Sequence, residues 1–470
     1  MPANSWPENN SFPEFEPLSS ILSAWSDSES EAAEDVYRGY KGRRRKAAVL
    51  LVFVWSGTVA LHLLSFGSWI VLGFTGVMGI HALRVLLTRP ADAPPPLSEE
   101  TREHWPRVSL LVAAKNEEAV IAKLIDILCN LDYPKTLYEV WAIDDNSSDR
   151  TPQVLERLQK KYDNLKVFRR SADATGGKSG ALNQVLPLTC GEILAVFDAD
   201  AQVSPDVLRR VLPAFHRPQV GAVQMRKAIA NPSVNFLTRG QMAEMALDSY
   251  FQQQRTALGG IGELRGNGEF IRRHALERCG GFNEETITDD LDLTLRLHLD
   301  RWDIEFLMVP VREEGVTQPL ALWHQRNRWG EGGYQRYLDY WRLILSNRMG
   351  IGKTWDMFNF WTIQYFLPAA TVPDLLMAIA RNRLPVFAPI TSLAIALSLV
   401  AMFVGLRRIE TSSSRQSRSQ PTSSRFIHLL QTLRGTVYMF HWLGIVASIA
   451  IRMSVRPKRL KWVKTLHQGS

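Results

Sequence analysis

The segment Ile193–Asp200, which reads Ile-Leu-Ala-Val-Phe-Asp-Ala-Asp, decides the fold. Its five apolar residues indicate a short buried strand, and two carboxylates follow at the end of that strand. A second apolar segment, Tyr138–Ile143, ends in the same way at Asp144 and Asp145. Strands that alternate with helices form a mostly parallel sheet, and ligands bind beyond the carboxyl ends of its strands. We therefore expect both acidic pairs to meet at one edge of the sheet.

The chain around these segments continues the alternating pattern. Val108–Ala114 and Leu165–Arg169 read as further strands. Helices are expected from about Lys115 to Asn130 and from Thr151 to about Tyr162, the second with a threonine N-cap and a proline in its first turn. No glycine-rich phosphate-binding motif follows the first strand, so other groups must neutralise a bound phosphate. The sequence predicts an α/β fold.

The spacing of Asp198 and Asp200 suits a metal site. Both carboxylates can point into one cleft, and such hard oxygen ligands suit Mg²⁺, or Mn²⁺, bridging a diphosphate. An ion there would stabilise a departing nucleoside diphosphate. Because a lone Asp-x-Asp is common in loops, the prediction depends on its position after a buried strand and downstream of Asp144 and Asp145.

Two other segments offer polar groups to a nucleotide. Asp144 and Asp145 can hydrogen-bond a base or ribose, but the following Asn146-Ser147 equally fits an Asx turn that closes the strand. Lys178 lies in a glycine-rich segment and can place a positive charge on a phosphate or a uracil oxygen. The structural alternative for Lys178 is a solvated loop lysine.

The acidic segment Thr288-Asp289-Asp290 precedes a helical pattern. These carboxylates either complement the helix dipole or supply a general base that activates an acceptor hydroxyl for attack on a sugar carbon. Further along, Gln325, Arg328 and Trp329 stand together. Arginine can bind a diphosphate bidentately and tryptophan can stack on a sugar, whereas the structural alternative is a helix packed against the core.

A glycine-rich turn, Gly266–Glu269, lies between these motifs, and the basic pair Arg272-Arg273 follows it. We expect the turn and the basic pair to line the pocket for the acceptor.

The segment after Trp329 has the pattern of an amphipathic helix. We expect this helix, over residues 334–350, to lie in the membrane interface at the depth of a lipid headgroup. The alternative is a helix packed in the core. Its apolar face comprises Tyr334, Tyr337, Leu338, Trp341, Ile344 and Leu345, and its polar face comprises Arg336, Asp339, Arg342 and Arg348.

Hydrophobic segments of membrane length lie on both sides of the α/β region. Ala47–Phe66 and Ser68–Leu87 precede it, and Phe358–Ala380 and Leu384–Gly405 follow it. Each is long enough to cross a hydrocarbon core of roughly 30 Å. Gly435–Ile451 is shorter, and a basic tail follows it, so we expect a re-entrant or interfacial segment there. The basic cluster before the first span predicts a cytoplasmic N-terminus and a cytoplasmic catalytic domain.

Charge indicates a membrane partner rather than nucleic acid. The net charge is +8, but the basic residues cluster beside the hydrophobic segments, where anionic lipid headgroups are the expected partner. Residues 1–37 hold eight acidic and no basic residues and are expected to be disordered. The predicted organisation is an acidic tail (1–40), two transmembrane helices (47–87), a catalytic domain (100–333), an interfacial helix (334–350), two transmembrane helices (358–405), a Ser/Arg-rich loop (406–425), a transmembrane or re-entrant segment (434–453) and a basic tail (454–470).

Taken together, the ordered motifs resemble the membrane-attached branch of the inverting glycosyltransferase family 2, whose catalytic domain has the GT-A fold. The match covers roughly residues 106–345. The resemblance implies that Asp145 and Lys178 contact the nucleotide. It also implies that Asp198 and Asp200 hold the sugar nucleotide and a metal ion.

The same resemblance assigns the remaining motifs. Asp290 would be the base, and Gln325, Arg328 and Trp329 would close the donor or acceptor site. The family usually has glutamate where this chain has Asp289. Asp290 is then the base by its place as the final acid of the motif, with Asp289 as the alternative.

Over the whole chain, including the acidic tail and Trp55–Leu61, the sequence is similar to cyanobacterial lipid glucosyltransferases of this family. That similarity implies transfer of glucose from UDP-glucose to 1,2-diacylglycerol, with inversion, with Mg²⁺ as cofactor, and in the plasma or thylakoid membrane. The alternative enzyme is a processive polysaccharide synthase of the cellulose, chitin or hyaluronan type, for whose export tunnel four or five spans are few. A non-catalytic scaffold is disfavoured because every acidic motif is retained.

Overall fold

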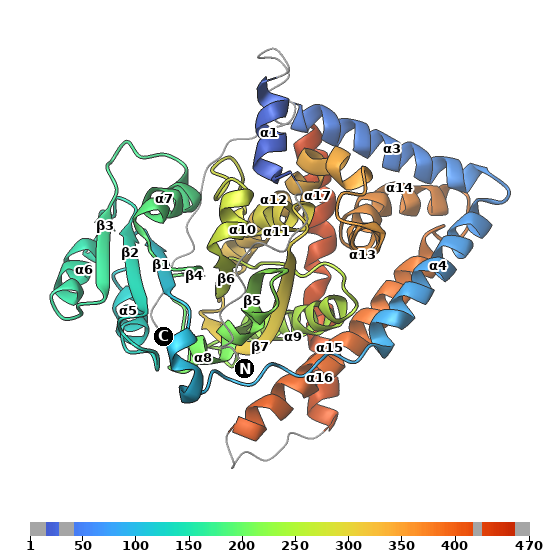
Figure 1. The fold of residues 1–470 in the computed structure, drawn as a ribbon. Helices are drawn as coiled ribbons and strands as arrows, with labels where there is room; N and C mark the ends of the chain where they lie inside the picture. Colours follow the sequence, from blue (N-terminus) through green and yellow to red (C-terminus); the bar gives the residue numbers. More distant parts are fainter. Residues whose placement is uncertain (1–15, 28–41, 417–424, 456–470) are drawn as a thin grey trace, which may run out of the picture.

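A seven-stranded sheet forms the centre of the catalytic domain (Figure 1). The structure, a computed structural model, describes residues 16–27, 42–416 and 425–455. The strand order is β3-β2-β1-β4-β6-β5-β7, and β6 alone runs antiparallel to its neighbours. The predicted mostly parallel α/β sheet is confirmed. The strands are β1 Val108–Ala114, β2 Tyr138–Asp144, β3 Leu165–Arg169, β4 Ile193–Phe197, β5 Val220–Ile229, β6 Glu269–Arg272 and β7 Asp303–Glu313.

Helices cover both faces of the sheet because its strands are apolar on both sides. In β1, Leu110 and Val112 belong to one hydrophobic cluster and Leu111 to the other, as the two-residue period of a strand requires. The first cluster includes α5 Ile121–Leu128, α6 Thr151–Gln159 and α8 Val207–Val211. The second includes α7 Gly177–Val185, α10 Arg273–Arg278 and α11 Asp289–Leu299.

The loop after β1 is longer than predicted, so helix α5 begins at Ile121 rather than at Lys115. Asn116 adopts a positive φ of 55°, which a helix does not allow. Its backbone N–H donates to Ser147 Oγ at 2.9 Å, and the next N–H donates to Thr151 Oγ1 at 2.8 Å. Thr151 is therefore a helical residue that binds this loop, and Arg150 occupies the N-cap position.

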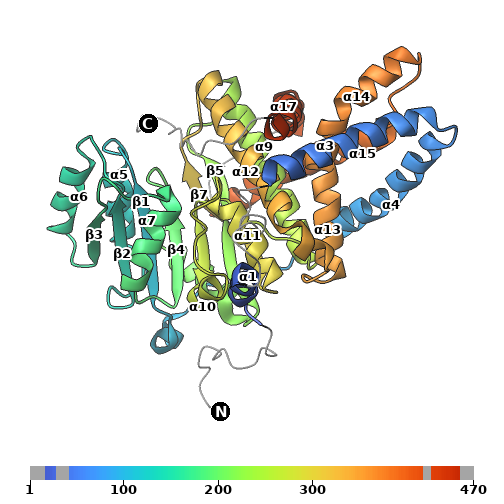
Figure 2. The same cartoon turned by 90° about the horizontal axis from the view of Figure 1, so that it is seen from above.

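The long helices lie on one side of the sheet (Figure 2). Among the described residues, five helical segments are long and apolar enough to cross a membrane: Arg43–Leu63, Gly67–Leu87, Ile351–Ala380, Ala388–Thr411 and Arg425–Val455. The helices of this region are α3 Arg43–Leu63, α4 Gly67–Leu87, α9 Phe236–Ala257, α12 Pro319–Leu345, α13 Ile351–Trp361, the π-helical turn Thr362–Phe366, α14 Leu367–Ala380, α15 Ala388–Gln416, α16 Arg425–Met439 and α17 His441–Val455.

The structure favours the core-packed alternative for most of residues 334–343, which belong to α12 and are buried or partly buried except at Trp341 and Arg342. Tyr334, Tyr337 and Tyr340 pack in a cluster with α11, α17 and α3. On the polar face, Arg336 pairs with Glu263 and Asp339 pairs with Arg43, each at 2.6 Å. The spacing of the apolar residues predicted the helix, but it could not show which residues would pair with the charged side chains of Arg336 and Asp339.

The acidic N-terminal tail is not wholly disordered, contrary to the prediction. Leu18–Asp27 forms α1, the Leu18 side chain is buried, and its backbone N–H donates to Asp300 Oδ1 at 2.9 Å. The rest of the predicted tail (1–15 and 28–41), residues 417–424 of the Ser/Arg-rich loop and the basic tail from residue 456 lie outside the described residues.

Candidate active site

Two acidic residues follow β4 at the carboxyl edge of the sheet, as predicted. The Asp198 side chain is 40% exposed and accepts a hydrogen bond from Lys178 Nζ at 2.7 Å. Asp200 is buried, and its Oδ2 accepts from the backbone N–H of Glu314, just beyond β7, at 2.9 Å. One carboxylate is therefore accessible, while the other also ties the ends of two strands together.

Lys178 reaches Asp198 from the first turn of α7. The turn before it needs glycine at two positions, since Gly176 and Gly177 have φ of 80° and 54°. A side chain at Gly176 would also overlap the carboxylate of Glu284. Lys178 Nζ donates a second hydrogen bond to Gly266 O at 2.8 Å. These two contacts favour the functional interpretation over a solvated lysine.

The acidic pair Asp289 and Asp290 begins α11. Asp290 lies beside Gly266, because a Cβ added to that glycine would stand 3.3 Å from Asp290 Oδ2. Burial and the neighbouring Asp289 raise the pKa of Asp290 to about 6, although Lys178 and Lys227 oppose the change. A carboxylate with this pKa is mostly ionised at neutral pH and is a stronger base than an ordinary aspartate. The geometry brings the predicted base to the predicted donor site.

Glu269, at the start of β6, was not predicted as a separate functional residue. Its side chain is fully buried, and neither carboxyl oxygen has a hydrogen-bond partner among the described residues. Burial, followed by the negative charge of Asp289, raises the pKa of Glu269 well above its usual range, and Lys178 opposes this change. Proton loss from this carboxyl group is therefore harder than from an exposed glutamate. Its signal in the sequence was a single acid directly before two apolar strand residues.

Arg328, on α12, lies in the electrostatic field of the acidic residues. Burial lowers the pKa of Arg328, while Asp198, Asp290 and Asp289 oppose that change. The structure therefore brings Arg328 close to Asp198 and to the Asp289-Asp290 pair.

Trp329 and Gln325 are positioned by a residue that sequence reasoning missed. The Arg326 guanidinium carbon lies 4.0 Å from the centre of the Trp329 ring, and Arg326 Nη1 donates to Gln325 Oε1 at 2.8 Å. Arg326 is itself fully buried and pairs with Glu244 of α9 at 2.5 Å. Lys227 Nζ also lies over the Trp329 ring, 5.1 Å from its centre. The sequence alone could not show that Arg326, rather than Arg328 two residues later, is the buried arginine that positions its neighbours.

Lys227 of β5 and Glu313 at the end of β7 complete this edge of the sheet with an ion pair of 2.8 Å. Burial lowers the pKa of Lys227, but Glu313 and Asp198 outweigh it and hold the pKa above its ordinary value. The signal for Lys227 was a basic residue inside an apolar strand. Lys178, Lys227 and Arg328 together bring three positive charges to a site without a glycine-rich phosphate loop.

The two acids after β2 have different roles. Asp144 Oδ1 accepts from the backbone N–H of Ser147 at 3.1 Å, and Asn146 between them has φ of 53°, so the Asx-turn alternative holds for Asp144. Asp145 instead pairs with Arg170 and, at 3.4 Å, with Lys115. Asp144 is buried, and Asp145 is the partly exposed member of the pair.

The expectation that Arg272 and Arg273 line the acceptor pocket is wrong. Arg272 donates to the carbonyls of Phe215 and Val220, and Arg273 donates to the carbonyl of Gly191 at 2.7 Å. Because β6 is antiparallel, its carboxyl end lies at the opposite edge of the sheet from the site. Only the turn before β6 belongs to the site.

Known proteins resemble this chain over part or all of its length. The model of the family described as glycosyl transferase family 2 matches residues 109–280. The beta-monoglucosyldiacylglycerol synthase of Trichormus variabilis is 63% identical over 100% of both chains, and that of Synechocystis sp. is 54% identical over 99% of this chain and 97% of its own. A solved structure of mannosyltransferase PcManGT from Pyrobaculum calidifontis, in complex with GDP-Man and Mn²⁺, shares 20% identity and a TM-score of 0.47 over 85% of this chain and 98% of that one.

Proposed function

Because this chain belongs to the glycosyltransferases of family 2, in the group of the beta-monoglucosyldiacylglycerol synthases, we propose that it transfers glucose from UDP-glucose to 1,2-diacylglycerol with inversion at the sugar carbon. The observation that carries this proposal is 54% to 63% identity over essentially the whole chain to synthases of that name. The family also agrees with the predicted GT-A type of catalytic domain. A processive polysaccharide synthase is not favoured.

The donor site follows from the charges at the sheet edge. Lys178 and Arg328 would neutralise the diphosphate, Asp145 would contact the nucleoside, and Gln325 and Trp329 would enclose the sugar. Arg326 and Lys227 would hold Trp329 in position for this role, because their cationic groups lie 4.0 Å and 5.1 Å from the centre of its ring.

A divalent ion, Mg²⁺ or Mn²⁺, fits the donor set at Asp198 and Asp200. The described residues hold no group of three or more histidine, cysteine or acidic side chains suited to a metal ion. The diphosphate and water would therefore supply the remaining oxygen ligands, as is usual for Mg²⁺. When bound, the ion would stabilise the charge that develops on the departing UDP.

Asp290 would accept the proton of the acceptor hydroxyl. The raised pKa of this carboxylate makes it a better base than an exposed aspartate, and the neighbouring Asp289 is one cause of that rise. One base acting on one displacement inverts the sugar carbon.

The location proposed is a multi-pass membrane protein with its catalytic domain on the cytoplasmic face. The basic residue Arg43, at the start of α3, pairs with Asp339 of α12, so this end of α3 lies beside the catalytic domain. Basic residues next to a span favour the cytoplasmic side.

The test is to incubate membranes that contain the protein with labelled UDP-glucose and diacylglycerol, and to partition the products between organic and aqueous phases. We expect one organic-soluble glucolipid with a β linkage by NMR. An Asp290→Asn variant should not form it, and an Asp163→Asn variant, at an exposed acid, is the matched control. Label in long aqueous or insoluble chains would refute the proposal.

A further inference from the structure

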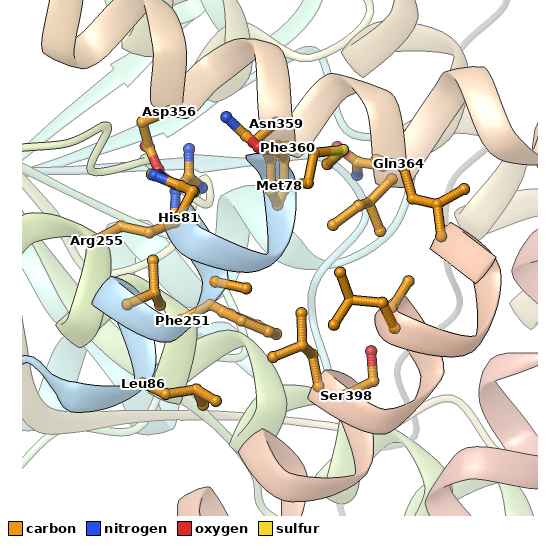
Figure 3. A pocket seen from close by; sticks show the side chains of 17 residues that line it. Met78, His81, Leu86, Phe251, Arg255, Asp356, Asn359, Phe360, Gln364 and Ser398 are labelled. Atoms are coloured by element: carbon orange, nitrogen blue, oxygen red, sulfur yellow. Dashed lines mark hydrogen bonds and ion pairs between the residues drawn. The ribbon is translucent and has the colours of Figure 1, made fainter. Parts of the chain in front are cut away.

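An apolar pocket lies outside the site described above, among the candidate membrane spans (Figure 3). Its cavity volume is about 120 Å³. Helices α4, α9, α13 and α15 and the π-helical turn enclose it. Its apolar lining includes Met78, Val85, Phe251, Ile363, Leu393 and Leu397.

One end of the pocket is polar. Figure 3 shows Arg255, His81 and Asp356 together at this end, with Asn359 beside them. Arg255 Nε donates to Asp356 Oδ2 at 2.9 Å, and His81 Nε2 lies 3.3 Å from Asp356 Oδ1. The backbone N–H of Ile261 also donates to Asp356 Oδ2 at 2.9 Å, which fixes this group against the segment before the active site.

Several polar atoms at the pocket are buried without a partner. Arg255 Nη2 and Asn359 Oδ1 have no hydrogen-bond partner among the described residues, although both side chains are at least nine-tenths buried. Gln364 Oε1, in the π-helical turn, is also buried and has no hydrogen-bond partner among the described residues. Such turns are frequent at functional sites. Buried polar groups are almost always hydrogen-bonded, so these atoms indicate a ligand that offers both an acceptor and a donor.

The charges at the polar end select a neutral ligand. Arg255 already pairs with Asp356 and has Glu263 at 3.9 Å, so its positive charge is balanced. An anionic headgroup would meet these carboxylates and be repelled. An ester carbonyl can accept from Arg255 Nη2 without adding charge, and a hydroxyl can donate to Asn359 Oδ1.

We propose that this pocket binds diacylglycerol taken from the bilayer, with one acyl chain in the apolar part and the glycerol end at Arg255 and Asn359. This inference rests on the proposed function, since it names where the acceptor of that reaction is held. The pocket adjoins the segment Glu263–Gly266, which begins at a partner of Arg255 and ends beside the base Asp290. The pocket would thus hold diacylglycerol before it reacts, and the segment Glu263–Gly266 connects the pocket to Asp290.

The first test uses two matched variants of α15. Ala394 lines the pocket, while Ala396, on the same helix, is exposed and does not. Ala394→Trp should raise the KM for long-chain diacylglycerol about tenfold or more, because excluding two methylene groups from an apolar site costs that much. The KM for UDP-glucose should not change, and Ala396→Trp should leave both constants unchanged. An Ala394→Trp enzyme that matches Ala396→Trp would overturn the inference.

The second test needs no variant. The full-length protein in vesicles is photolabelled with a diacylglycerol that carries a diazirine at the end of one acyl chain, and in parallel with a phosphatidylcholine of the same design. We expect the diacylglycerol probe to label peptides of α4 and α15, and unlabelled diacylglycerol to compete. Equal labelling by phosphatidylcholine would identify a bilayer phospholipid as the occupant and refute the proposal, as would labelling confined to other helices. Failure of the proposed function is distinct, because the wild-type protein would then form no glucolipid at all.

Discussion

The pH dependence of transfer provides the sharpest test of the base. The pKa of Asp290 is raised to about 6 by burial and by Asp289, and only the ionised form can accept a proton. With that value, roughly nine-tenths of the enzyme is active at pH 7 and about one-tenth at pH 5. We therefore expect kcat/KM to fall about tenfold between these two pH values. Removing the base by Asp290→Asn should reduce kcat by roughly 10²- to 10⁴-fold.

Replacing the neighbouring acid, Asp289, should shift the pH profile without removing activity. Asp289→Asn removes a negative charge that raises the pKa of Asp290, so the acidic limb of the profile should move below pH 6 while the activity at neutral pH remains. Initial rates at saturating UDP-glucose, measured from about pH 5 to about pH 8, would show the shift. If Asp289→Asn abolished transfer and Asp290→Asn retained it, Asp289 would be the base and the reasoning would be refuted.

The pH dependence of thermal stability shows whether an inactive Asp290→Asn variant is still folded. A folded-state pKa above the unfolded value means that stability present at low pH is lost as the pH rises through about 6. Replacing Asp290 by asparagine removes that loss, so the variant should unfold at a higher temperature than the wild type at pH 8, with no such gain below the unfolded pKa. A variant that is inactive because it is unfolded would instead melt earlier at every pH.

Three further outcomes follow from the same contacts. Arg326→Ala leaves the buried carboxylate of Glu244 unpaired and should lower the free energy of unfolding by about 3 to 5 kcal/mol, measured by thermal or chemical unfolding in detergent, whereas an exposed control such as Arg102→Ala should not. Removing divalent ions with a chelator should stop transfer and adding Mg²⁺ should restore it, and full activity in excess chelator would contradict the role proposed for Asp198 and Asp200. Gly332→Ala should cost about 1 to 3 kcal/mol and lower kcat, because the added methyl group overlaps the side chain of Thr288, next to the acidic pair; an unchanged melting temperature would contradict this packing.

The fold and the meeting of the motifs could be predicted because both depend on local patterns. Ile193–Phe197 and Tyr138–Asp144 are short, apolar and bounded by acids, so their identity as strands and the position of the acids at their ends are local properties. The parallel direction of the strands then brings Asp145 and Asp198 to one edge without further information.

The rest of the site could not be predicted because it depends on long-range packing. Glu269, Lys227 and Glu313 come from three strands, and only the sheet order β6-β5-β7 makes them neighbours. Arg336 and Asp339 recur with the period of a surface helix, yet each finds an opposite charge from a distant segment. A row of charged residues on one helix predicts a solvent-exposed face only when no oppositely charged residue from a distant segment packs against it.

Helix α12 links the proposed base, Asp290, to the candidate membrane helices. At Gly332 the helix touches Thr288, which precedes the acidic pair, and at Gly333 it touches the hydroxyl of Tyr365 in the π-helical turn. Side chains at these two glycines would overlap both neighbours, so the helix is in direct contact with the loop of the base on one side and the membrane helices on the other. Gln325, Arg328 and Trp329 lie on the same helix. A shift of the membrane helices would therefore move the donor-site residues and the base together, which is what an enzyme requires when its acceptor comes from the bilayer and its donor comes from water.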